Sequence, residues 1–424
     1  MIQRPKGTKD IYGHDQKIYS LIFSSFEALA KSYNFQKITT PIFESLSLFK
    51  DTSGETSDIV VKELYSFKDL SNRELALRPE GTAPVARALV ENKLLINKRF
   101  NKLFYIGPMF RYEKPQKGRM RQFYQIGTEL VGDNSIYSII EIIDLGQRFL
   151  KQLKIEDWVL KINNIGTKEE REIFTKELSV YFSENQADLS PLSVSRIHTN
   201  PLRILDDKVD SQKSVVLNAP KINDFLASES RKSFDELLSL LKSFGISYEV
   251  DPVLVRGLDY YTNVVFEFES HSKTLGTKST IIGGGCYDNL IQNSGQDIVG
   301  VGFGLGVERL FEILKDNSTI TDDKVDVYFM INNEKEFEVM FPMICELRNQ
   351  NIVVDFNKKF TKQKKVFAEA TLFESAQIVY YELFSNPDNK LITIKNTIKN
   401  AKIEVEQQQV VKNILEGIAN EKNK

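Results

Sequence analysis

A basic hairpin is the feature that most constrains this chain. Residues 104–129 have the pattern of an apolar strand, a turn containing Pro115 and Gly118, and a returning strand. Its basic residues are Arg111, Lys114, Lys117, Arg119 and Arg121, and its acidic residues are Glu113 and Glu129. Guanidinium groups bind phosphate oxygens bidentately, and an aromatic ring such as Phe123 offers a stacking surface for a nucleobase. The pattern predicts a polyphosphate site on a sheet; the alternative is a solvated hairpin tip.

Composition sets the outer limits. A chain of 424 residues is too long for one ordinary core, so two or three domains are expected. A hydrophobic content of 41%, a charged content of 27% and a net charge of −2 are typical of a globular protein, and any nucleic-acid site must be a local basic patch. The two cysteines and three histidines have neither a disulfide framework nor zinc-ligand spacing, so no protein-built metal site is predicted.

The sequence shows no targeting or membrane segment. Residues 1–7 are polar and lack the apolar core of a signal peptide. No run of 18 apolar residues occurs, so no membrane span is predicted. We therefore expect a cytoplasmic location.

The first part of the chain predicts a largely antiparallel sheet, because strands and helices follow one another without regular alternation. An extended segment at 38–43 contains Pro41, which belongs at a sheet edge or an interface. The other expected elements are helices at 15–33, 82–90 and 137–153 and short strands at 64–67 and 75–77. From about 168 to 249 the pattern becomes charged and helical, which indicates an inserted module.

Strand signals resume at Val253. A strand is expected around 266–268 and a glycine-rich turn at 283–287. Residues 300–310 alternate glycine with apolar residues and then become helical, which fits close backbone packing on a central strand. The glycine spacing does not match a dinucleotide-binding turn, since Glu308 and Arg309 fall where the third glycine should be.

The last hundred residues predict a small α/β domain after a polar linker at 315–324. Strands alternate with helices there, and the basic run 358–365 is interpreted as a solvated helix start. The expected strands are 325–331, 352–356, 376–381 and 391–394, and the expected helices are 334–348, 362–371 and 405–418.

Two further segments have residues suited to binding chemistry. Residues 78–82 put Glu80 and Thr82 at a strand-to-helix turn, although both residue types also favour a helix N-terminus. Residues 256–261 combine Arg256 with an aspartate and two tyrosines, although a tyrosine-rich strand with a surface ion pair has the same pattern. Together with the hairpin and Arg309, these segments supply enough guanidinium and carboxylate groups to neutralise a triphosphate and hold an amino acid.

These segments resemble the signature segments of the histidyl-tRNA synthetases, which are class II aminoacyl-tRNA synthetases. The similar segments are 5–10, 78–83, 104–129, 196–206, 255–261 and 302–310, so the resemblance spans nearly the whole chain. It implies an α+β fold: a catalytic domain on an antiparallel sheet with a helical insertion, and a C-terminal α/β anticodon-binding domain. The boundaries it suggests are 1–167 and 251–320 for the catalytic domain, 168–250 for the insertion and 325–424 for the anticodon-binding domain.

The resemblance also implies roles for individual residues. Arg256 and Arg111 would be catalytic, both at the α-phosphate, and Gln116 would face the acceptor end of the tRNA. The implied histidine-binding residues are Glu80, Thr82, Gln125, Glu129, Tyr260, Tyr261 and Tyr287. The implied ATP-binding residues are Arg111, Glu113, Arg119, Phe123 and Arg309. No residue would act as a nucleophile, so catalysis would consist of positioning and electrostatic stabilisation.

Three positions depart from the family pattern. Cys286 stands where arginine is usual and Asn289 where glycine is usual, which puts the shape of the Tyr287 loop in question. Lys114 replaces a frequent arginine, which keeps the charge but loses the planar fork.

The resemblance thus implies a ligase that joins histidine to tRNA(His) through histidyl-adenylate, using ATP with its Mg²⁺, as a homodimer. Two alternatives are a non-catalytic paralogue that regulates histidine biosynthesis and a pure RNA-binding protein. The paralogue usually lacks the C-terminal domain. A pure RNA-binding protein would not need Glu80, Glu129 and Tyr261 together.

Overall fold

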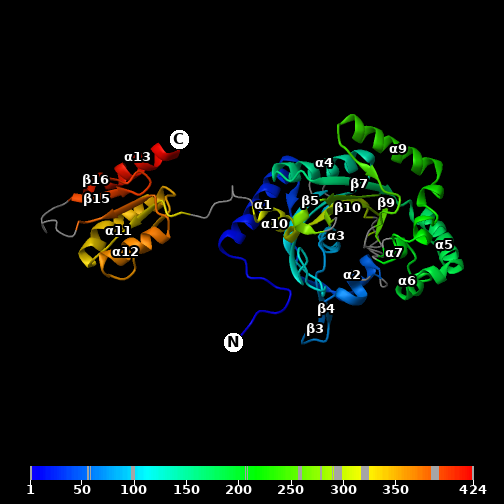
Figure 1. Ribbon diagram of the computed structural model, residues 1–424. Helices are drawn as coiled ribbons and strands as arrows, with labels where there is room; N and C mark the ends of the chain where they lie inside the picture. The colour runs from blue at the N-terminus through cyan, green and yellow to red at the C-terminus, as the bar shows by residue number, and fades with distance from the viewer. Residues whose placement is uncertain are drawn as a thin grey trace. The chain divides into compact units, whose positions relative to one another are not determined.

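The chain divides into two compact units, Met1–Ile320 and Thr321–Lys424, each of which is considered by itself (Figure 1). The computed structural model describes residues 2–54, 57, 59–96, 101–205, 207, 209–255, 260–276, 279–288, 290, 298–316, 324–382 and 391–422. Within these residues, no helix is long and apolar enough to cross a membrane.

A large sheet forms the centre of the first unit. Among the described residues it has eight strands in the order β1-β5-β6-β11-β10-β9-β7-β8. Only the outermost pairs, β1 with β5 and β7 with β8, are parallel, so the predicted antiparallel sheet is confirmed. The strands are β1 Gln36–Lys37, β5 Lys102–Phe110, β6 Gln122–Val131, β7 Trp158–Asn164, β8 Glu249–Val250, β9 Tyr261–Ser270, β10 Ser279–Tyr287 and β11 Gly300–Gly306.

Three helices cover one face of this sheet: α1 (Gly13–Ser32), α4 (Ile136–Gln152) and α10 (Val307–Leu314) (Figure 1). Their apolar sides pack on strand residues such as Phe104 and Ile126 to form the largest core of the protein. Helical periodicity in the sequence predicted α1 and α4, and both are confirmed.

The opposite face is covered differently. Helix α3 (Thr82–Glu91) packs there with residues of β5, β9 and β10. Beside it lie α2 (Leu46–Ser53) and a small sheet in the order β2-β4-β3, which has three strands in the described part of the chain: β2 Phe43–Ser45, β4 Glu74–Leu77 and β3 Ser66–Lys68. The expected strands at 64–67 and 75–77 are confirmed to within two residues.

The segment between β7 and β8 is helical and has its own core. Helix α5 begins with a capping box, in which Thr167 and Glu170 each accept a hydrogen bond from the other's backbone N–H. Buried residues such as Phe174 and Leu178 form a cluster separate from the main core. The helices are α5 Lys168–Glu184, α6 Pro191–Arg196, α7 Leu202–Leu205, α8 Ser214–Leu217 and α9 Ser228–Ser243, the last of which packs on α4 instead.

The second unit is an α/β domain, as the alternating pattern predicted. Its sheet has the order β13-β12-β14-β15-β16, five strands within the described residues. The strands are β12 Val327–Phe329, β13 Val354–Phe356, β14 Gln377–Tyr380, β15 Leu391–Asn396 and β16 Ala401–Glu406, and the helices are α11 Glu334–Asn349, α12 Gln363–Leu372 and α13 Val410–Lys422.

Three local predictions were wrong or incomplete. Residues 283–287 are not a turn but part of β10, where the glycines let neighbouring backbones approach closely. Residues 401–406 form strand β16, which was not predicted and pairs with β15, so the helix expected at 405–418 begins at Val410. Strand β7 was not predicted at all.

Candidate active site

The candidate site lies on the face of the main sheet opposite α1, α4 and α10. Side chains alternate along β6, so Ile126 and Leu130 join the helix-covered core while Gln125 and Glu129 point the other way. The glycines of β11 leave room for them: a Cβ on Gly302 would lie 2.4 Å from Glu129 Oε2, and one on Gly304 would lie 2.5 Å from Gln125 Nε2. The alternating glycines therefore form the floor of a polar pocket.

Glu129 lies at the centre of this pocket and is 1% exposed. Neither of its carboxylate oxygens has a hydrogen-bond partner among the described residues. Burial is the main cause that raises its pKa to about 8, the charge on Glu80 adds to this, and the hydroxyls of Thr82 and Tyr287 act in the opposite direction. Those hydroxyls influence the carboxylate electrostatically without meeting hydrogen-bond geometry. A buried carboxyl group without a partner is available to bond a polar group of a bound molecule.

Tyrosines form the walls around Glu129. The ring centroids of Tyr260 and Tyr261 are 4.7 Å apart, and those of Tyr260 and Tyr287 are 6.2 Å apart with nearly perpendicular planes. Burial raises the pKa of Tyr287 well above its ordinary value, and the nearby Glu129 raises it further. Burial also raises the pKa of Tyr260 well above its ordinary value, so at physiological pH the phenols of Tyr260 and Tyr287 are neutral and able to donate hydrogen bonds.

Tyr105 is a pocket residue that the sequence analysis missed. Its ring lies between Gly81 and Gly127, where a Cβ on either glycine would be 2.2 Å from a ring atom. Its hydroxyl is buried and has no hydrogen-bond partner among the described residues. Burial raises its pKa well above the ordinary value, and the charges of Glu129 and Glu80 raise it further. The available signal was strand alternation, which puts Tyr105 opposite Gly127 on the same face as Glu129.

Glu80 and Thr82 lie at the start of α3. The two carboxylate oxygens of Glu80 accept hydrogen bonds from the backbone N–H groups of Thr82 (2.6 Å) and Ala83 (2.9 Å). Burial raises the pKa of Glu80, and these two bonds oppose the shift. Glu80 thus satisfies backbone N–H groups at the start of the helix, which is the structural role that its residue type also favours. The neighbouring Thr82 belongs to the pocket, because its hydroxyl influences the pKa values of Glu129, Tyr105 and Tyr260.

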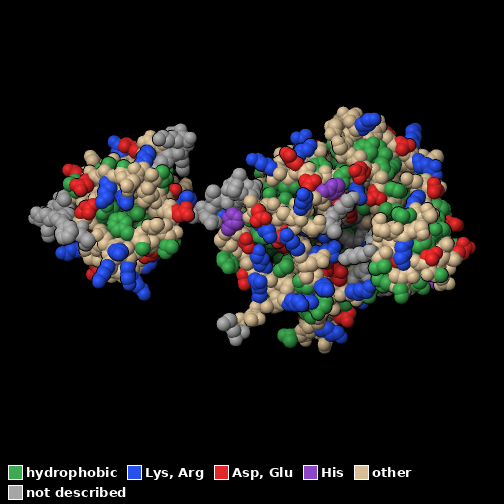
Figure 2. All heavy atoms as spheres, viewed as in Figure 1, with side chains coloured by type: hydrophobic (Ala, Val, Ile, Leu, Met, Phe, Trp, Pro, Cys, Tyr) green, Lys and Arg blue, Asp and Glu red, His purple; other side chains and the backbone are tan. Residues whose placement is uncertain are grey.

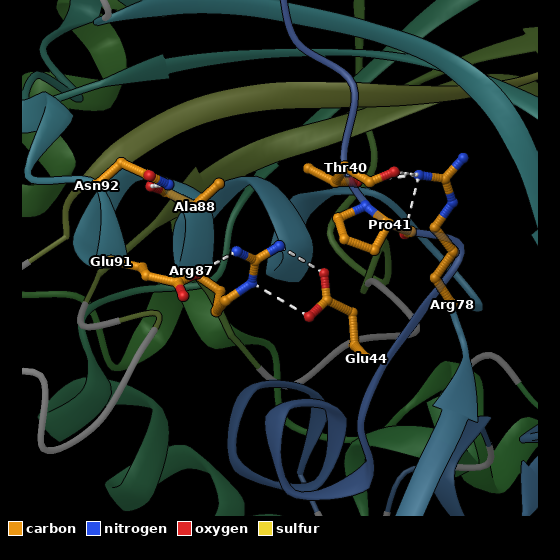
Figure 3. A network of polar contacts seen from close by, with 8 residues as sticks. All are labelled: Thr40, Pro41, Glu44, Arg78, Arg87, Ala88, Glu91 and Asn92. Carbon is orange, nitrogen blue, oxygen red and sulfur yellow. Dashed lines mark hydrogen bonds and ion pairs between the residues drawn. The ribbon is translucent and has the colours of Figure 1, made fainter. Parts of the chain in front are cut away.

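A buried arginine fixes the backbone that leads to Glu80. Arg78 donates to Thr40 O and Oγ1, each at 2.9 Å, and to Pro41 O at 3.3 Å (Figure 3). It also donates to Pro108 O at 2.9 Å. Beside it, Arg87 of α3 binds both carboxylate oxygens of Glu44, at 2.7 and 3.1 Å (Figure 3). These contacts hold the segment at 40–44, the start of α3 and strand β5 in one arrangement.

The basic hairpin forms the second half of the site. Arg111 donates through Nε to Pro79 O at 2.8 Å, and its guanidinium carbon lies 5.4 Å from the centroid of the Phe123 ring. Gly118 at the hairpin tip packs against Arg309, because a Cβ there would be 3.0 Å from Arg309 Cγ. Arg309 also donates to the Thr280 carbonyl oxygen. Of the predicted ATP-binding arginines, Arg111 is therefore part of the hairpin and Arg309 packs on its tip.

Arg119 and Glu113 face each other across this hairpin. Arg119 Nη1 lies 3.3 Å from Glu113 Oε2, and the two side chains are 39% and 17% exposed. Gln116 and Arg119 exchange backbone hydrogen bonds of 3.1 and 2.9 Å, which close the exposed turn. Arg119 and Glu113 therefore form an ion pair beside the turn, in which neither side chain is fully buried.

The structure also shows what the family departures affect. Cys286 is fully buried and packs in the helix-covered core, on the face opposite Tyr287, and burial raises its pKa to about 12. Asp288 accepts hydrogen bonds from Thr262 Oγ1 (2.9 Å) and Asn134 Nδ2 (2.8 Å), which fix the end of β10. Cys286 therefore changes packing behind the pocket; Asn289 lies outside the described residues.

The predicted residues thus form two adjoining groups. The pocket contains Glu80, Thr82, Gln125, Glu129, Tyr260, Tyr261 and Tyr287. The hairpin group contains Arg111, Glu113, Arg119, Phe123 and Arg309, with Gln116 at its turn. Arg256 and its neighbours 257–259 lie outside the described residues. On the face of the first unit seen in Figure 2, basic and acidic side chains are interspersed, in keeping with the net charge of −2.

Comparison with known proteins agrees with this geometry. Residues 7–310 match the family model described as histidyl-tRNA synthetase. The chain is 44% identical to the histidine–tRNA ligase of Mycoplasmopsis pulmonis, over 95% of each chain, and 44% identical to that of Ureaplasma parvum, over 92% of this chain and 94% of the relative. Among solved structures it is similar to apo histidyl-tRNA synthetase of S. aureus, with a TM-score of 0.80, 30% identity and coverage of 98% and 100% of the two chains.

The antiparallel sheet, with its basic hairpin, glycine strand and following helix, is the fold of a class II aminoacyl-tRNA synthetase. The chain belongs to the histidyl-tRNA synthetase family.

Proposed function

We propose that this chain is a histidine–tRNA ligase. In the first step a carboxylate oxygen of histidine attacks the α-phosphorus of ATP, the bond to the β-phosphate breaks, and pyrophosphate leaves. In the second step a terminal ribose hydroxyl of tRNA(His) attacks the histidyl carbonyl, and AMP leaves as the hydroxyl proton is released. The observation that carries the proposal is Glu129, a buried carboxylate with no partner among the described residues and with tyrosine hydroxyls around it.

The imidazole ring explains why such a pocket selects histidine. Its ring N–H can donate to Glu129, and Tyr261 can satisfy the second nitrogen. An apolar amino acid of similar size would leave these buried groups unpaired, which is a strong basis for discrimination. Thr82, Gln125 and the carboxylate of Glu80 are proposed to hold the α-ammonium group, with Tyr260 and Tyr287 closing the pocket.

The hairpin group is proposed to bind ATP, which enters with its Mg²⁺. Phe123 would stack on the adenine, Glu113 would accept from the adenine amine, and Arg119 and Arg309 would hold the outer phosphates. Arg111 and Arg256 are left for the α-phosphate, where charge develops in the transition state. The role of Arg256 remains a prediction from sequence. Gln116 is proposed to face the acceptor end of the tRNA.

We also propose a homodimer, the domain boundaries given above and a cytoplasmic location, since charged tRNA is used by ribosomes. Ile42 and Phe43 support an interface, because they are 45% and 54% exposed on the segment that contains Pro41. The second unit is proposed to bind the anticodon. A chain ending near residue 324 should then keep pyrophosphate exchange and lose most tRNA charging. Loss of exchange in a folded, dimeric truncated chain would contradict this division.

Exchange of pyrophosphate into ATP, measured with each of the twenty amino acids, tests the proposed function. Histidine alone should support exchange. Exchange with no amino acid would favour the non-catalytic paralogue. RNA binding without exchange would favour a pure RNA-binding protein.

A further inference from the structure

The N-terminal segment at residues 5–8 lies against the base of the basic hairpin. The carbonyl oxygen of Gly7 accepts two hydrogen bonds, from Arg121 N at 2.8 Å and from Gln122 N at 3.2 Å. The segment itself is folded by Thr8, whose backbone N–H and hydroxyl both donate to Pro5 O, at 3.3 and 2.8 Å. A stretch of chain outside the sheet is thus bonded to the place where the hairpin returns into β6.

Only glycine fits at this contact. Gly7 has φ +83°, and a Cβ on it would lie 2.6 Å from Arg121 Cγ and 2.9 Å from Arg121 Cβ and Cδ. The stem of Arg121 is near its own backbone and cannot swing away as a side-chain end could. A side chain at position 7 would therefore push the segment off the hairpin.

Arg121 transmits this contact to the nucleotide half of the site. Its Nε donates to Glu113 O at 3.2 Å, and its guanidinium carbon lies 3.9 Å from the centroid of the Tyr112 ring. Its carbonyl oxygen accepts from Arg111 N at 2.9 Å. The backbone from 111 to 113 is consequently held by Arg121, and it carries Arg111 and Glu113, two residues proposed to contact ATP.

We infer that Gly7 and Arg121 are positioning residues for the ATP half of the site, and that the segment at 5–8 braces the hairpin in the geometry that binds the nucleotide. The inference rests on the proposed function, because it assigns a specific role within the ATP-binding step. The histidine pocket is built from other parts of the sheet, with Gln125 and Glu129 further along β6. Loss of the contact between the segment at 5–8 and the hairpin should therefore weaken ATP binding and leave histidine binding nearly unchanged.

Gly7→Ala tests the brace, and Gly13→Ala is its matched control. Gly13 also has a positive φ, +56°, but a Cβ there would meet nothing within 4 Å, so it reproduces the backbone strain without the collision. The first readout is the equilibrium dissociation constant for MgATP, which needs no amino-acid activation. The second is the pair of Michaelis constants, for ATP and for histidine, in pyrophosphate exchange.

Gly7→Ala should raise the ATP dissociation constant and the ATP Michaelis constant about tenfold, which is the expected cost of about two hydrogen bonds. The histidine constant should change by less than about twofold, and Gly13→Ala should resemble the parent protein in both readouts. Gly7→Ala should also add less in an Arg121→Ala background, because that change removes the Cγ and Cδ atoms with which the new Cβ would collide.

Three results would overturn the inference: normal ATP binding in Gly7→Ala, an equal change in Gly13→Ala, or additive effects of Gly7→Ala and Arg121→Ala. Unfolding temperatures of all variants exclude general loss of structure. If the parent protein activated no amino acid, the proposed function would fail, while the ATP dissociation constants would still decide whether the brace exists.

Discussion

The two faces of the main sheet use the same strands for opposite purposes. On one face, Phe104 and other apolar side chains pack under α1, α4 and α10, where Phe26 makes perpendicular ring contacts with Phe104 and Phe149 at 5.9 and 4.9 Å. On the other, Tyr105, Gln125 and Glu129 bury oxygen atoms that have no partner among the described residues. Of two neighbouring residues of a strand, one therefore stabilises the fold and the other is available to bind a ligand. Substitutions at adjacent residues of one strand can therefore change stability and ligand binding separately.

The largest expected effect is the pH dependence of stability caused by Glu129. The folded protein keeps the Glu129 proton up to about pH 8, whereas the unfolded chain releases it above its ordinary pKa of 4.5. Raising the pH across this window therefore favours the unfolded chain, by on the order of 5 kcal/mol at about 1.4 kcal/mol per pH unit. Denaturant unfolding of the ligand-free parent protein and of Glu129→Gln, between pH 5 and pH 8.5, should show the parent losing stability relative to the glutamine variant. Parallel curves for the two proteins would mean that Glu129 does not titrate in this window.

The next effect concerns the apolar face. Phe104→Ala removes a fully buried ring between α1 and the sheet, and should lower the free energy of unfolding by about 3–5 kcal/mol. In the fraction that stays folded, measured at low temperature, the Michaelis constants for histidine and ATP should be close to those of the parent. A selective rise in the histidine constant would show that the two faces are not separable at this position.

Substitution on the polar face should change histidine binding rather than stability. Glu129→Ala removes the proposed imidazole partner and should raise the Michaelis constant for histidine about 100-fold, because a buried ring N–H is left without an acceptor, while the constant for ATP changes little. Pyrophosphate exchange measures both. An equal loss for the two substrates would count against Glu129 as a residue of the amino-acid pocket.

The smallest expected effect comes from Thr128, the residue next to Glu129 on β6. Its hydroxyl is buried on the helix-covered face and has no partner among the described residues. Thr128→Val keeps the shape and removes the unsatisfied hydroxyl, so it should raise the free energy of unfolding by about 1 kcal/mol with normal exchange activity. A stability loss, seen as a lower unfolding temperature, would indicate that the hydroxyl has a bonding role in solution.

Local features of the site could be predicted from sequence, and non-local ones could not. The basic hairpin is continuous in sequence, so its strands, its turn and the proximity of Arg111 to Phe123 follow from one segment. Tyr105 was missed because the glycines that make room for it, Gly81 and Gly127, come from other segments. The same holds for Arg78, whose acceptors Thr40 and Pro108 lie 38 residues before it and 30 residues after it in the chain. Glycines at 283–285 suggested a turn because turns are their commonest use, whereas here they allow three strands to pack closely.

The glycine floor of β11 limits how this sequence can change over generations. At positions 300, 302 and 304 any added carbon atom would collide with Tyr287, Glu129 or Gln125, or with the neighbouring strand. No compensating substitution elsewhere can create the missing space without removing a pocket residue. At the alternate positions, Val301, Phe303 and Leu305, the side chains point into the core, where other apolar residues of similar volume are tolerated. Neutral drift along this part of the strand should therefore have a period of two, with variation at positions 301, 303 and 305 and the least at 300 and 302, where a Cβ would also meet a backbone oxygen.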